Sequence, residues 1–435
     1  MEKVNNKASN TENKFKKILK VMGPGIITGA ADDDPSGIAT YAQTGTQFGY
    51  GLLWTTLYLL PLMIATQEAC ARIGAVTEKG LMGVIKINYS KKIVYITVIL
   101  ILIANTINIG ADLGAMAEAT KLIIPLRFAF LVILYTIIIL ILEIFTSYKV
   151  YSRILKWLSL ALLAYPITVF IINEPWTTLI KATLIPHFEF SFTFLFIITA
   201  VLGTTISPYM FFWETSEEVE QEKEIRIRKI KGKPKITKEF MHNLRLDNFS
   251  GMVASEFTTW CIIVVAATVL NAHNITTINT AADAAKALEP LVHTFPNSGF
   301  WAEMIFAIGI IGLGLLSVPV LSGSASYAVS EAFNWKEGLN LKLKRAHGFY
   351  GVIIIATFIG LLINFLGINP IKALVYTAVI NGIVAVPLIF LIERVSQNEK
   401  IMGKYKSGRL SKTLLWITFF GMGAAAVSLF ISLGH

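Results

Sequence analysis

The stretch ITGAADDDPSGIATY, residues 27–41, interrupts an apolar segment with three consecutive aspartates followed by Pro-Ser-Gly. Pro35 has no backbone N–H and disfavours helical geometry at the residue before it, Asp34. The flanking pieces, residues 22–31 and 37–48, are each too short to cross a bilayer at about 1.5 Å per residue. We therefore expect one helix that is broken at membrane depth, where irregular backbone must face protein or a wet cavity.

The rest of the chain has the composition of a polytopic membrane protein. Of its 435 residues, 54% are hydrophobic and 15% are charged, whereas soluble domains carry about 25% charged residues. Apolar runs near the length of a bilayer crossing recur throughout. We predict eleven spans, at about 22–48, 51–75, 93–119, 123–146, 151–172, 192–219, 247–271, 300–332, 346–366, 370–392 and 411–432.

The basic residues fix the orientation of these spans. With the N-terminus inside, 32 of the 38 Lys and Arg residues fall in inside segments and five fall outside, as expected when cytoplasmic loops retain positive charge. The net charge of +10 is thus explained by topology and does not indicate nucleic-acid binding. We expect a multi-pass protein of the cell membrane with a cytoplasmic segment at 1–21 and a transmembrane domain at 22–435.

The first 20 residues lack the apolar core and small-residue cleavage site of a signal peptide. The most basic loop, residues 222–240, is read as an ordinary inside loop, although a regulatory or lipid-binding role stays open. Cys70 and Cys261 lie in apolar segments and are expected to be buried thiols. The sequence indicates no cofactor and no obligatory protein partner.

The sixth span repeats the break of the first. Its stretch AVLGTTISPYMFFWETSEE contains Gly203 and Pro208 within six residues. Two Gly/Pro-interrupted spans in corresponding places of two halves are typical of inverted-repeat transporters that bind their substrate at the breaks. We predict an all-α, LeuT-type fold of five plus five helices (22–172 and 192–392), with helices 1 and 6 discontinuous and an eleventh helix at 411–432.

The breaks carry chemistry suited to a cation. A carboxylate at membrane depth is costly and usually functional, and Asp34 lies at the break itself. Thr204, Thr205 and Ser207 add oxygens, which hard cations such as Mg²⁺ and Ca²⁺ prefer. The alternative for Asp34 is a helix cap, worth about 1 kcal/mol.

The two aspartates before Asp34 are less clearly assigned. We expect one of Asp32 and Asp33 to face an aqueous vestibule that attracts cations. Asp33 is included among the candidate ion ligands, and Asp32 among the candidate pathway residues.

The sequence resembles the Nramp family of divalent metal transporters over most of the chain. The residues of the first break carry part of this resemblance. The family's first-span motif, Asp-Pro-Gly-Asn, is matched by residues 34–37. The resemblance implies that Asp34 is the retained metal-binding aspartate. The metal-binding asparagine has become Gly37.

In the sixth span, the family motif Ala-X-X-Met-Pro-His is matched by Thr204, Ser207, Pro208 and Tyr209. The metal-binding methionine has become Ser207. Because thioether sulfur favours softer metals, its loss removes discrimination against Mg²⁺. Mg²⁺ also keeps several waters, which suits a site widened by Gly37. This pattern is similar to the Nramp-related magnesium transporters, so we expect Mg²⁺ transport with Mn²⁺ also accepted.

Typical members of the family transport protons together with the metal ion. We expect weak or no proton coupling in this chain, because several residues of the usual proton relay are replaced. Tyr209 replaces a family histidine, and Tyr does not titrate near neutral pH. In span 3, the aspartate that the family uses is retained as Asp112. Ala115 stands where the family has a glutamate, and Glu118 lies one turn further along the chain. Glu214 aligns with a second histidine.

Other intramembrane polar residues remain candidates. Asn381 lies near a polar metal-site position of the family. Asn105, Asn108 and Asp112 share one face of span 3 and could line the pathway or join helices. The acidic run from Glu214 to Glu220 could form an exit funnel for cations or a solvated helix end, and Glu68 is expected to pair with Arg72 at i,i+4.

Other functions are less consistent with these patterns. A proton-coupled Mn²⁺/Fe²⁺ importer remains the nearest alternative. A Na⁺-coupled organic solute carrier would offer backbone N–H groups to a carboxylate, which three adjacent aspartates would repel. No His-Glu-X-X-His or Gly-X-Ser-X-Gly motif with matching context indicates a membrane enzyme.

Overall fold

The computed structural model describes residues 28–29, 31–146, 162–172, 175–225 and 236–433. These residues form helices joined by short turns, with no strand among them. The predicted segment 1–21, most of the first half of span 1, much of span 5 and most of the basic loop 222–240 lie outside the described residues.

Within the described chain, eight helical segments are long and apolar enough to cross a membrane. They are α4 (Trp54–Thr77), α6 (Lys91–Ile123), α7 (Phe128–Phe145), the pair α11 (Phe192–Thr205) and α12 (Pro208–Ile225), α13 (Lys238–Val269), α15 (Ser298–Phe333), α17 (Pro370–Gln397) and α19 (Arg409–Leu433). These correspond to eight of the predicted spans. The ninth predicted span is represented by a shorter apolar helix, α16 (His347–Ile363).

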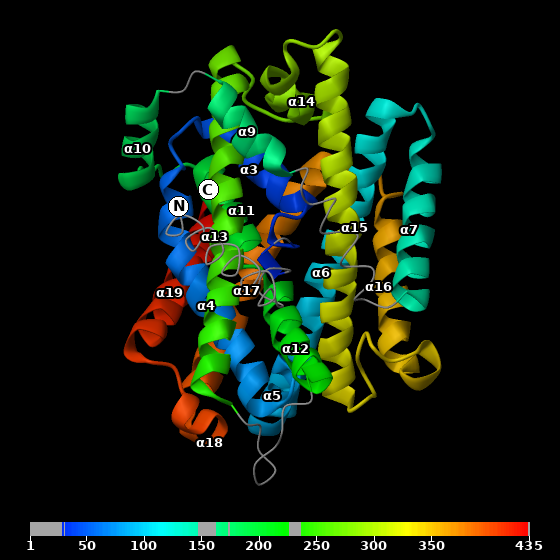
Figure 1. Cartoon of the computed structure of the whole chain (residues 1–435), viewed down its shortest axis with the longest axis vertical. Coiled ribbons are helices and arrows are strands. Elements are labelled where there is room, and N and C mark those ends of the chain that lie inside the picture. Colours follow the sequence, from blue (N-terminus) through cyan, green and yellow to red (C-terminus); the bar gives the residue numbers. More distant parts are fainter. Residues whose placement is uncertain (1–27, 30, 147–161, 173–174, 226–235, 434–435) are drawn as a thin grey trace, which may run out of the picture.

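The other helices are short. They are α3 (Pro35–Phe48), α5 (Leu81–Asn88), α9 (Ala164–Ile171), α10 (Trp176–Leu184), α14 (Ala281–Ala285) and α18 (Glu399–Met402), with 3-10 turns η2 (Asn271–His273), η3 (Lys286–Val292), η4 (Leu343–Arg345) and η5 (Gly403–Tyr405). In Figure 1, α5 and α18 lie at one end of the bundle and α10 and α14 at the other. This placement agrees with the alternation of inside and outside loops that the basic residues predict.

Helix packing brings the two breaks to the centre of the bundle. Helix α3 packs on α13 and α17, and α11 packs along α17. At Gly203, an added Cβ would lie 2.0 Å from the Ala378 carbonyl oxygen and 2.2 Å from the Gly382 nitrogen. Only glycine allows this approach, so α11 reaches its break in direct backbone contact with α17.

The outer helices carry the apolar surface that faces lipid. Helices α7 and α19 expose large side chains along their lengths, including Phe130, Ile137, Ile141, Phe420 and Phe430. Such an apolar surface is costly in water and stable in a bilayer. The structure therefore has the surface of a membrane-embedded bundle.

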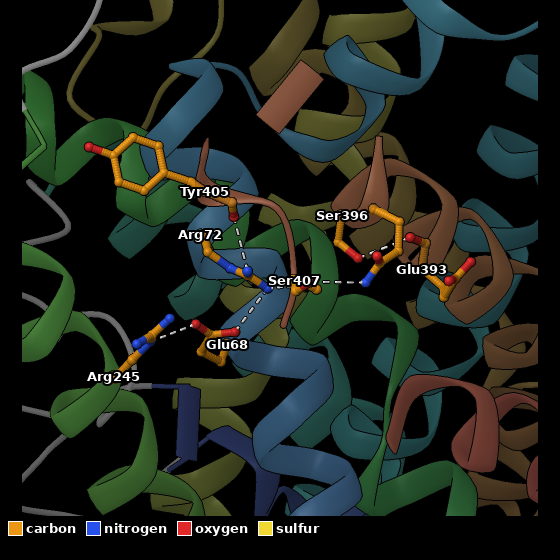
Figure 2. Close-up of polar contacts among 8 residues, drawn as sticks. Glu68, Arg72, Arg245, Glu393, Ser396, Tyr405 and Ser407 are labelled. Atoms are coloured by element: carbon orange, nitrogen blue, oxygen red, sulfur yellow. Dashed lines mark hydrogen bonds and ion pairs between the residues drawn. The ribbon is translucent and has the colours of Figure 1, made fainter. Parts of the chain in front are cut away.

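The buried side chain of Arg72 joins α4 to the connection before α19 (Figure 2). The predicted pair of Glu68 and Arg72 is confirmed at 3.1 Å. Arg72 also donates to the Tyr405 carbonyl oxygen at 3.0 Å and to the Ser407 hydroxyl at 2.6 Å. Arg245 of α13 approaches Glu68 at 3.0 Å. These contacts hold α4, α13 and the connection before α19 together at the end of the bundle where α18 lies.

The two thiols behave as expected from the sequence. Cys70 and Cys261 are both free and buried. They contribute to packing within α4 and α13 and form no disulfide.

Candidate functional site

The first break is built around Asp34. This residue is the N-cap of α3, in extended geometry, and Pro35 is the first residue of the helix. Asp34 Oδ1 accepts hydrogen bonds from the Gly37 backbone N–H at 2.7 Å and the Ser36 hydroxyl at 2.8 Å. Asp34 therefore does cap the second half-helix, as the alternative interpretation predicts. Capping occupies one carboxylate oxygen and leaves the other to face a neighbouring helix.

That second oxygen faces α6. Asn108 donates to Asp34 Oδ2 at 3.1 Å. One helical turn further along α6, Asp112 accepts a hydrogen bond from Ser317 of α15 at 2.7 Å, and its other oxygen has no partner among the described residues. Asn105, in the opposite direction, donates to the Leu321 carbonyl oxygen. The polar residues of α6 therefore have different roles. Asn105 joins α6 to α15, whereas Asn108 orients the carboxylate of Asp34.

The second break separates α11 from α12. Pro208, the first residue of α12, cannot donate to the carbonyl of Thr204. The Ser207 hydroxyl supplies this donor, at 2.9 Å from the Thr204 oxygen and 2.6 Å from the Gly203 oxygen. Ser207 therefore stabilises the break through its proton and keeps lone pairs available as ligands.

Two hydroxyl contacts join the breaks to each other. Tyr209 donates to the Ala31 carbonyl oxygen at 3.0 Å. The hydroxyls of Tyr41 and Thr205 lie 3.0 Å apart. Both contacts are buried, so the structure holds the two interrupted helices together at their irregular segments.

The position of Gly37 is surrounded by oxygen atoms. A Cβ placed there would lie 3.1 Å from the Asp32 carbonyl oxygen, 3.2 Å from the Thr204 hydroxyl and 3.4 Å from Asp34 Oδ1. Three of the predicted site residues therefore meet at one point, from both breaks. The space is narrow in this conformation, so a hydrated ion would need these elements to separate.

Asp32 and Asp33 face a different helix. The Ser255 hydroxyl of α13 lies 2.6 Å from Asp32 Oδ2 and 3.3 Å from Asp33 Oδ1. Thr259 lies one turn further along, with its hydroxyl 3.5 Å from Asp33 Oδ1. The three aspartates are thus divided, with Asp34 directed toward α6 and the other two toward α13.

The remaining predicted residues are scattered. Glu214 is buried and accepts a hydrogen bond from Thr28, near the start of the described chain. Glu118 forms a partly exposed pair with Lys121 at 3.0 Å, and no hydrogen bond joins it to Asp112. Asn381 is buried, and neither end of its amide has a hydrogen-bond partner in the part of the chain that the structure describes.

The position of Asn381 is defined by its neighbour in the chain. Gly382 contacts Gly203, just before the second break. Asn381 of α17 is therefore the chain neighbour of a residue that packs against α11 just before the second break, and its role as a site residue stays a prediction.

The acidic run on α12 is not a solvated helix end. Glu214, Glu217, Glu218 and Glu220 are each at most 9% exposed. Glu220 accepts a hydrogen bond from Asn340 at 2.9 Å. The interpretation of this run as a solvated helix end is wrong, because α12 packs against α4 and α15.

The donor set around the breaks favours a hard cation. Among the described residues, no group of three or more His, Cys, Asp and Glu side chains is arranged to hold a metal ion. The oxygens gathered at Gly37 are instead one carboxylate, one hydroxyl and one carbonyl. Such mixed oxygen ligands suit Mg²⁺, Ca²⁺ and Mn²⁺.

Sequence reasoning missed the residues of α13. Ser255 and Thr259 contact Asp32 and Asp33, and neither was singled out, whereas Glu256 beside them was noted only as an intramembrane acid without an assigned partner. The signal was present, because Gly251, Ser255 and Thr259 recur every four residues and form one face of small side chains. Which helix that face would meet could not be read from the spacing.

Comparison with known families gives a match over nearly the whole chain. The profile of the family described as "Nramp: Natural resistance-associated macrophage protein-like" matches residues 25–432. A protein named divalent metal cation transporter MntH, from Caldanaerobacter subterraneus subsp. tengcongensis, is 25% identical over 92% of this chain and 90% of its own length. Another of the same name, from Klebsiella pneumoniae subsp. pneumoniae, is 26% identical over 99% and 96%.

Solved structures show the fold. A manganese transporter of Eremococcus coleocola superposes with a TM-score of 0.73 at 17% identity, covering 96% of this chain and 87% of that one. MhsT in complex with L-phenylalanine superposes with a TM-score of 0.63 at 12% identity, covering 94% and 98%. These likenesses confirm the predicted LeuT-type fold.

Proposed function

The chain belongs to the Nramp family, and on that premise we propose that it carries divalent metal cations across the membrane. The observation that carries the proposal is the meeting of Asp34, Thr204 and the Asp32 carbonyl around Gly37. This point lies where both interrupted helices lose their regular hydrogen bonding, the place at which transporters of this architecture bind substrate. The names of the MntH relatives and of the manganese transporter agree with a divalent substrate.

Alternating access follows from the burial of this site. Asp34, Thr204 and Ser207 are each 1% exposed, so the ion reaches them only after the breaks separate. The contacts between Tyr209 and Ala31 and between Tyr41 and Thr205 are the bonds that must open. In our proposal, one side of the bundle opens at a time while the ion stays between the breaks.

We propose that Mg²⁺ is the preferred ion and that Mn²⁺ is also accepted. Neither of the two departures from the family motif supplies a soft ligand, since Gly37 has no side chain and Ser207 offers oxygen. A site of few oxygen ligands suits Mg²⁺, which retains part of its water shell. The relatives are named divalent metal cation transporters, which leaves Mn²⁺ as the alternative preferred substrate.

Proton coupling is proposed to be weak or absent. The Tyr209 hydroxyl is engaged with a backbone carbonyl and does not titrate near neutral pH. Glu118 is paired with Lys121 away from Asp112. A proton-coupled Mn²⁺/Fe²⁺ importer is the competing function, and a Na⁺-coupled carrier of organic solutes is the second.

Uptake into proteoliposomes of purified protein distinguishes the proposed function from the proton-coupled importer. Mg²⁺, Mn²⁺ and Ca²⁺ are compared while a trapped dye reports internal pH. We expect uptake of Mg²⁺ and Mn²⁺ without metal-driven acidification. Acidification that scales with metal uptake would favour the proton-coupled importer, and no uptake of any divalent ion would overturn the proposal.

The matched variants are Asp34→Ala and Glu118→Ala. Loss of every ion is expected for Asp34→Ala, because this change removes the carboxylate at the first break, between the start of α3 and Asn108 of α6. Glu118→Ala removes an acid of the half-exposed pair with Lys121 and is expected to transport normally. Retained uptake in Asp34→Ala would show that the ion binds elsewhere.

A further inference from the structure

A cavity of about 310 Å³ lies in the groove between α4, α11 and α19. Helix α19 packs against both of the other helices, and Figure 1 shows it alongside α4. The volume is at the lower end of the range of ligand pockets, about 300–1,000 Å³. On α19 the wall is made of small residues three or four positions apart, namely Gly421, Ala424, Ala425 and Ser428. Gly421 and Ala424 are exposed, so the groove opens toward the lipid-facing side of the bundle.

The groove has the depth of one membrane leaflet. It follows α4 from Trp54, the first residue of that helix, to Leu62, about 12 Å at 1.5 Å per residue. Half of the hydrocarbon core of a bilayer is about 15 Å thick. The groove begins at the end of the bundle where α10 lies, because the Tyr58 hydroxyl of its wall donates to the Leu184 carbonyl oxygen of α10. The basic residues predict that this end is outside.

The deep part of the groove is apolar. Its two buried hydroxyls already donate to carbonyls of their own segments, Thr55 to Leu52 at 2.6 Å and Thr418 to Leu414 at 2.8 Å. The rest of the deep wall is aliphatic, and includes Leu59, Leu62, Ile198, Leu202 and Ile417. This part of the groove therefore favours a hydrocarbon chain over a polar solute.

The outer end holds a buried hydrogen-bond donor without an acceptor. Trp54 is 8% exposed, and its indole N–H has no partner in the described chain. The indole can only donate, and a buried Trp N–H usually finds an acceptor. The ring of Phe188 packs on the indole at 4.9 Å between centroids and holds it at the wall of the groove. Since Trp at a membrane interface lies at the level of the headgroups, the missing acceptor fits an ester carbonyl of a lipid.

The charge at the mouth indicates the kind of headgroup. Glu189 lines the groove, whereas no Lys or Arg is among the lining residues. Its carboxylate contacts His187 at 3.2 Å, and both side chains are about half exposed or more. Negative charge at a binding surface favours a partner that brings positive charge to it. A headgroup with an ammonium group meets this condition, and a purely anionic headgroup does not.

We propose that this groove binds one phospholipid of the outer leaflet whose headgroup carries an ammonium group. One acyl chain lies along α4 and α19 and ends beside Leu202, the residue before Gly203. An ester carbonyl accepts the hydrogen bond of Trp54, and the ammonium group pairs with Glu189. None of the groove residues belongs to the ion site at the breaks, so lipid binding does not depend on the proposed transport function.

The test counts bound lipids on the purified, delipidated protein by native mass spectrometry. Phosphatidylethanolamine and phosphatidylglycerol are titrated separately. Gly421→Leu fills the groove without a clash, because nothing lies within 4 Å of the Cβ position there. Gly351→Leu is the matched control, since its Cβ position on α16 is equally open and it does not line the groove. Gel filtration and thermal unfolding confirm that each variant is folded.

We expect the unchanged protein and Gly351→Leu to bind one phosphatidylethanolamine per chain with equal affinity. Gly421→Leu should bind it about tenfold more weakly or worse, because the leucine side chain takes the place of several methylene groups. Equal affinity in Gly421→Leu and the unchanged protein, or no lipid bound to the unchanged protein, would overturn the proposal. Should Gly421→Leu not fold, Ala425→Leu replaces it, with the same loss expected.

The donor at the outer end is tested separately. Trp54→Phe keeps an aromatic ring and removes the N–H, so phosphatidylethanolamine should bind about three- to tenfold more weakly, as for the loss of one hydrogen bond. Trp416→Phe, on α19 but outside the groove, should bind normally. Equal binding by these two variants would rule out Trp54 as the donor to the lipid.

The headgroup assignment is tested at Glu189. The unchanged protein should prefer phosphatidylethanolamine to phosphatidylglycerol, and Glu189→Gln should lose this preference. Glu289→Gln is the control, because it removes another exposed acid, bonded to Ser298 and outside the groove, and it should keep the preference. Equal binding of the two lipids by the unchanged protein would contradict the proposed ammonium headgroup.

Discussion

The Tyr209 hydroxyl donates to the Ala31 carbonyl oxygen at 3.0 Å and so joins the first turn of α12, after one helix break, to the segment before the other break. Both residues are at most 1% exposed. The bond connects segments 178 positions apart in sequence. Because it spans the two breaks, its strength bears directly on how readily they separate.

Tyr209→Phe should therefore loosen the closed arrangement without changing the response to pH. Loss of one buried hydrogen bond costs about 1 kcal/mol, which lowers the melting temperature slightly. Uptake between pH 5.5 and 8 should keep its profile, since neither Tyr nor Phe titrates there. Thermal unfolding and uptake against pH are measured, with Tyr41→Phe as the control from the other bridging contact. A changed pH profile only in Tyr209→Phe would indicate that Tyr209 belongs to a proton relay.

Asn108→Ala should weaken cation binding rather than folding. Asn108 donates to Asp34 Oδ2 and fixes the orientation of that carboxylate. A hydrogen bond to a charged group is worth about 1.5–3 kcal/mol, so half-maximal uptake should need roughly ten- to 100-fold more Mg²⁺. Radiotracer or dye-based uptake over a concentration series measures the change.

The control for that prediction lies on the same helix. Asn105→Ala removes an amide that bonds Leu321 and Ser324 of α15. It should lower thermal stability and leave the Mg²⁺ dependence unchanged. Equal shifts in the two variants would mean that Asn108 acts through helix packing alone.

The helix breaks could be predicted because their cause is local. Pro35 and Pro208 each remove a backbone donor, and the structure breaks both helices there. The direction of the neighbouring acids could not be predicted in this way. Asp32 and Asp33 differ from Asp34 only in the helix that packs beside them, α13 or α6, and a single sequence does not specify which helices meet.

The same limit explains the misread polar residues. Glu118 and Asp112 are six positions apart on α6, so they lie on different turns, and only Asp112 reaches a buried partner. The acids of α12 look solvated by composition, yet tertiary packing buries them. Asn108 was recognised as polar and facing inward, but its partner, Asp34, is 74 positions away in sequence.

Gly203→Ala should disrupt the packing that supports the second break. The added Cβ would meet backbone atoms of α17 at 2.0 and 2.2 Å, and backbone cannot move aside as a flexible side chain can. Overpacking of this kind costs about 1–3 kcal/mol or more. The melting temperature and the yield of folded protein report the effect. Gly351→Ala, in α16 with nothing within 4 Å of the Cβ position, is the control and should be neutral or stabilising, because Ala is about 1 kcal/mol better than Gly in a helix.

Arg72→Ala should destabilise the α18 end of the bundle. The Arg72 side chain is 2% exposed and bonds Glu68, Tyr405 and Ser407. Removing one partner of a buried ion pair costs about 3 kcal/mol or more. We expect a loss at the lower end of this range, because Glu68 keeps its ion pair with Arg245. Thermal unfolding in detergent measures the loss.

Arg245→Ala is the matched control for the same pair. Its side chain is 60% exposed, and an exposed ion pair contributes about 0–1 kcal/mol. The Arg72 variant should therefore melt clearly below the Arg245 variant. Equal melting temperatures would show that the links to Tyr405 and Ser407 contribute little.

Ion selectivity provides the last test, through the double variant Gly37→Asn with Ser207→Met. The new amide oxygen and thioether sulfur restore the family's ligands, and sulfur favours softer transition metals over Mg²⁺. The ratio of Mn²⁺ to Mg²⁺ uptake should rise about tenfold, equivalent to 1.4 kcal/mol. Competition between the two ions for uptake into proteoliposomes measures this ratio.

Crowding must be separated from ligand chemistry in that experiment, since a Cβ at residue 37 lies 3.1 Å from the Asp32 carbonyl oxygen. Replacing Ser207 also removes its hydrogen bonds to Gly203 and Thr204. Gly37→Ala adds the Cβ without an amide, and Ser207→Leu adds a side chain of similar size without sulfur. Because neither control supplies a ligand, both should keep the original ratio even where total uptake falls. A selectivity change of the same size in the controls would mean that the shape of the breaks, and not the identity of their ligands, selects the ion.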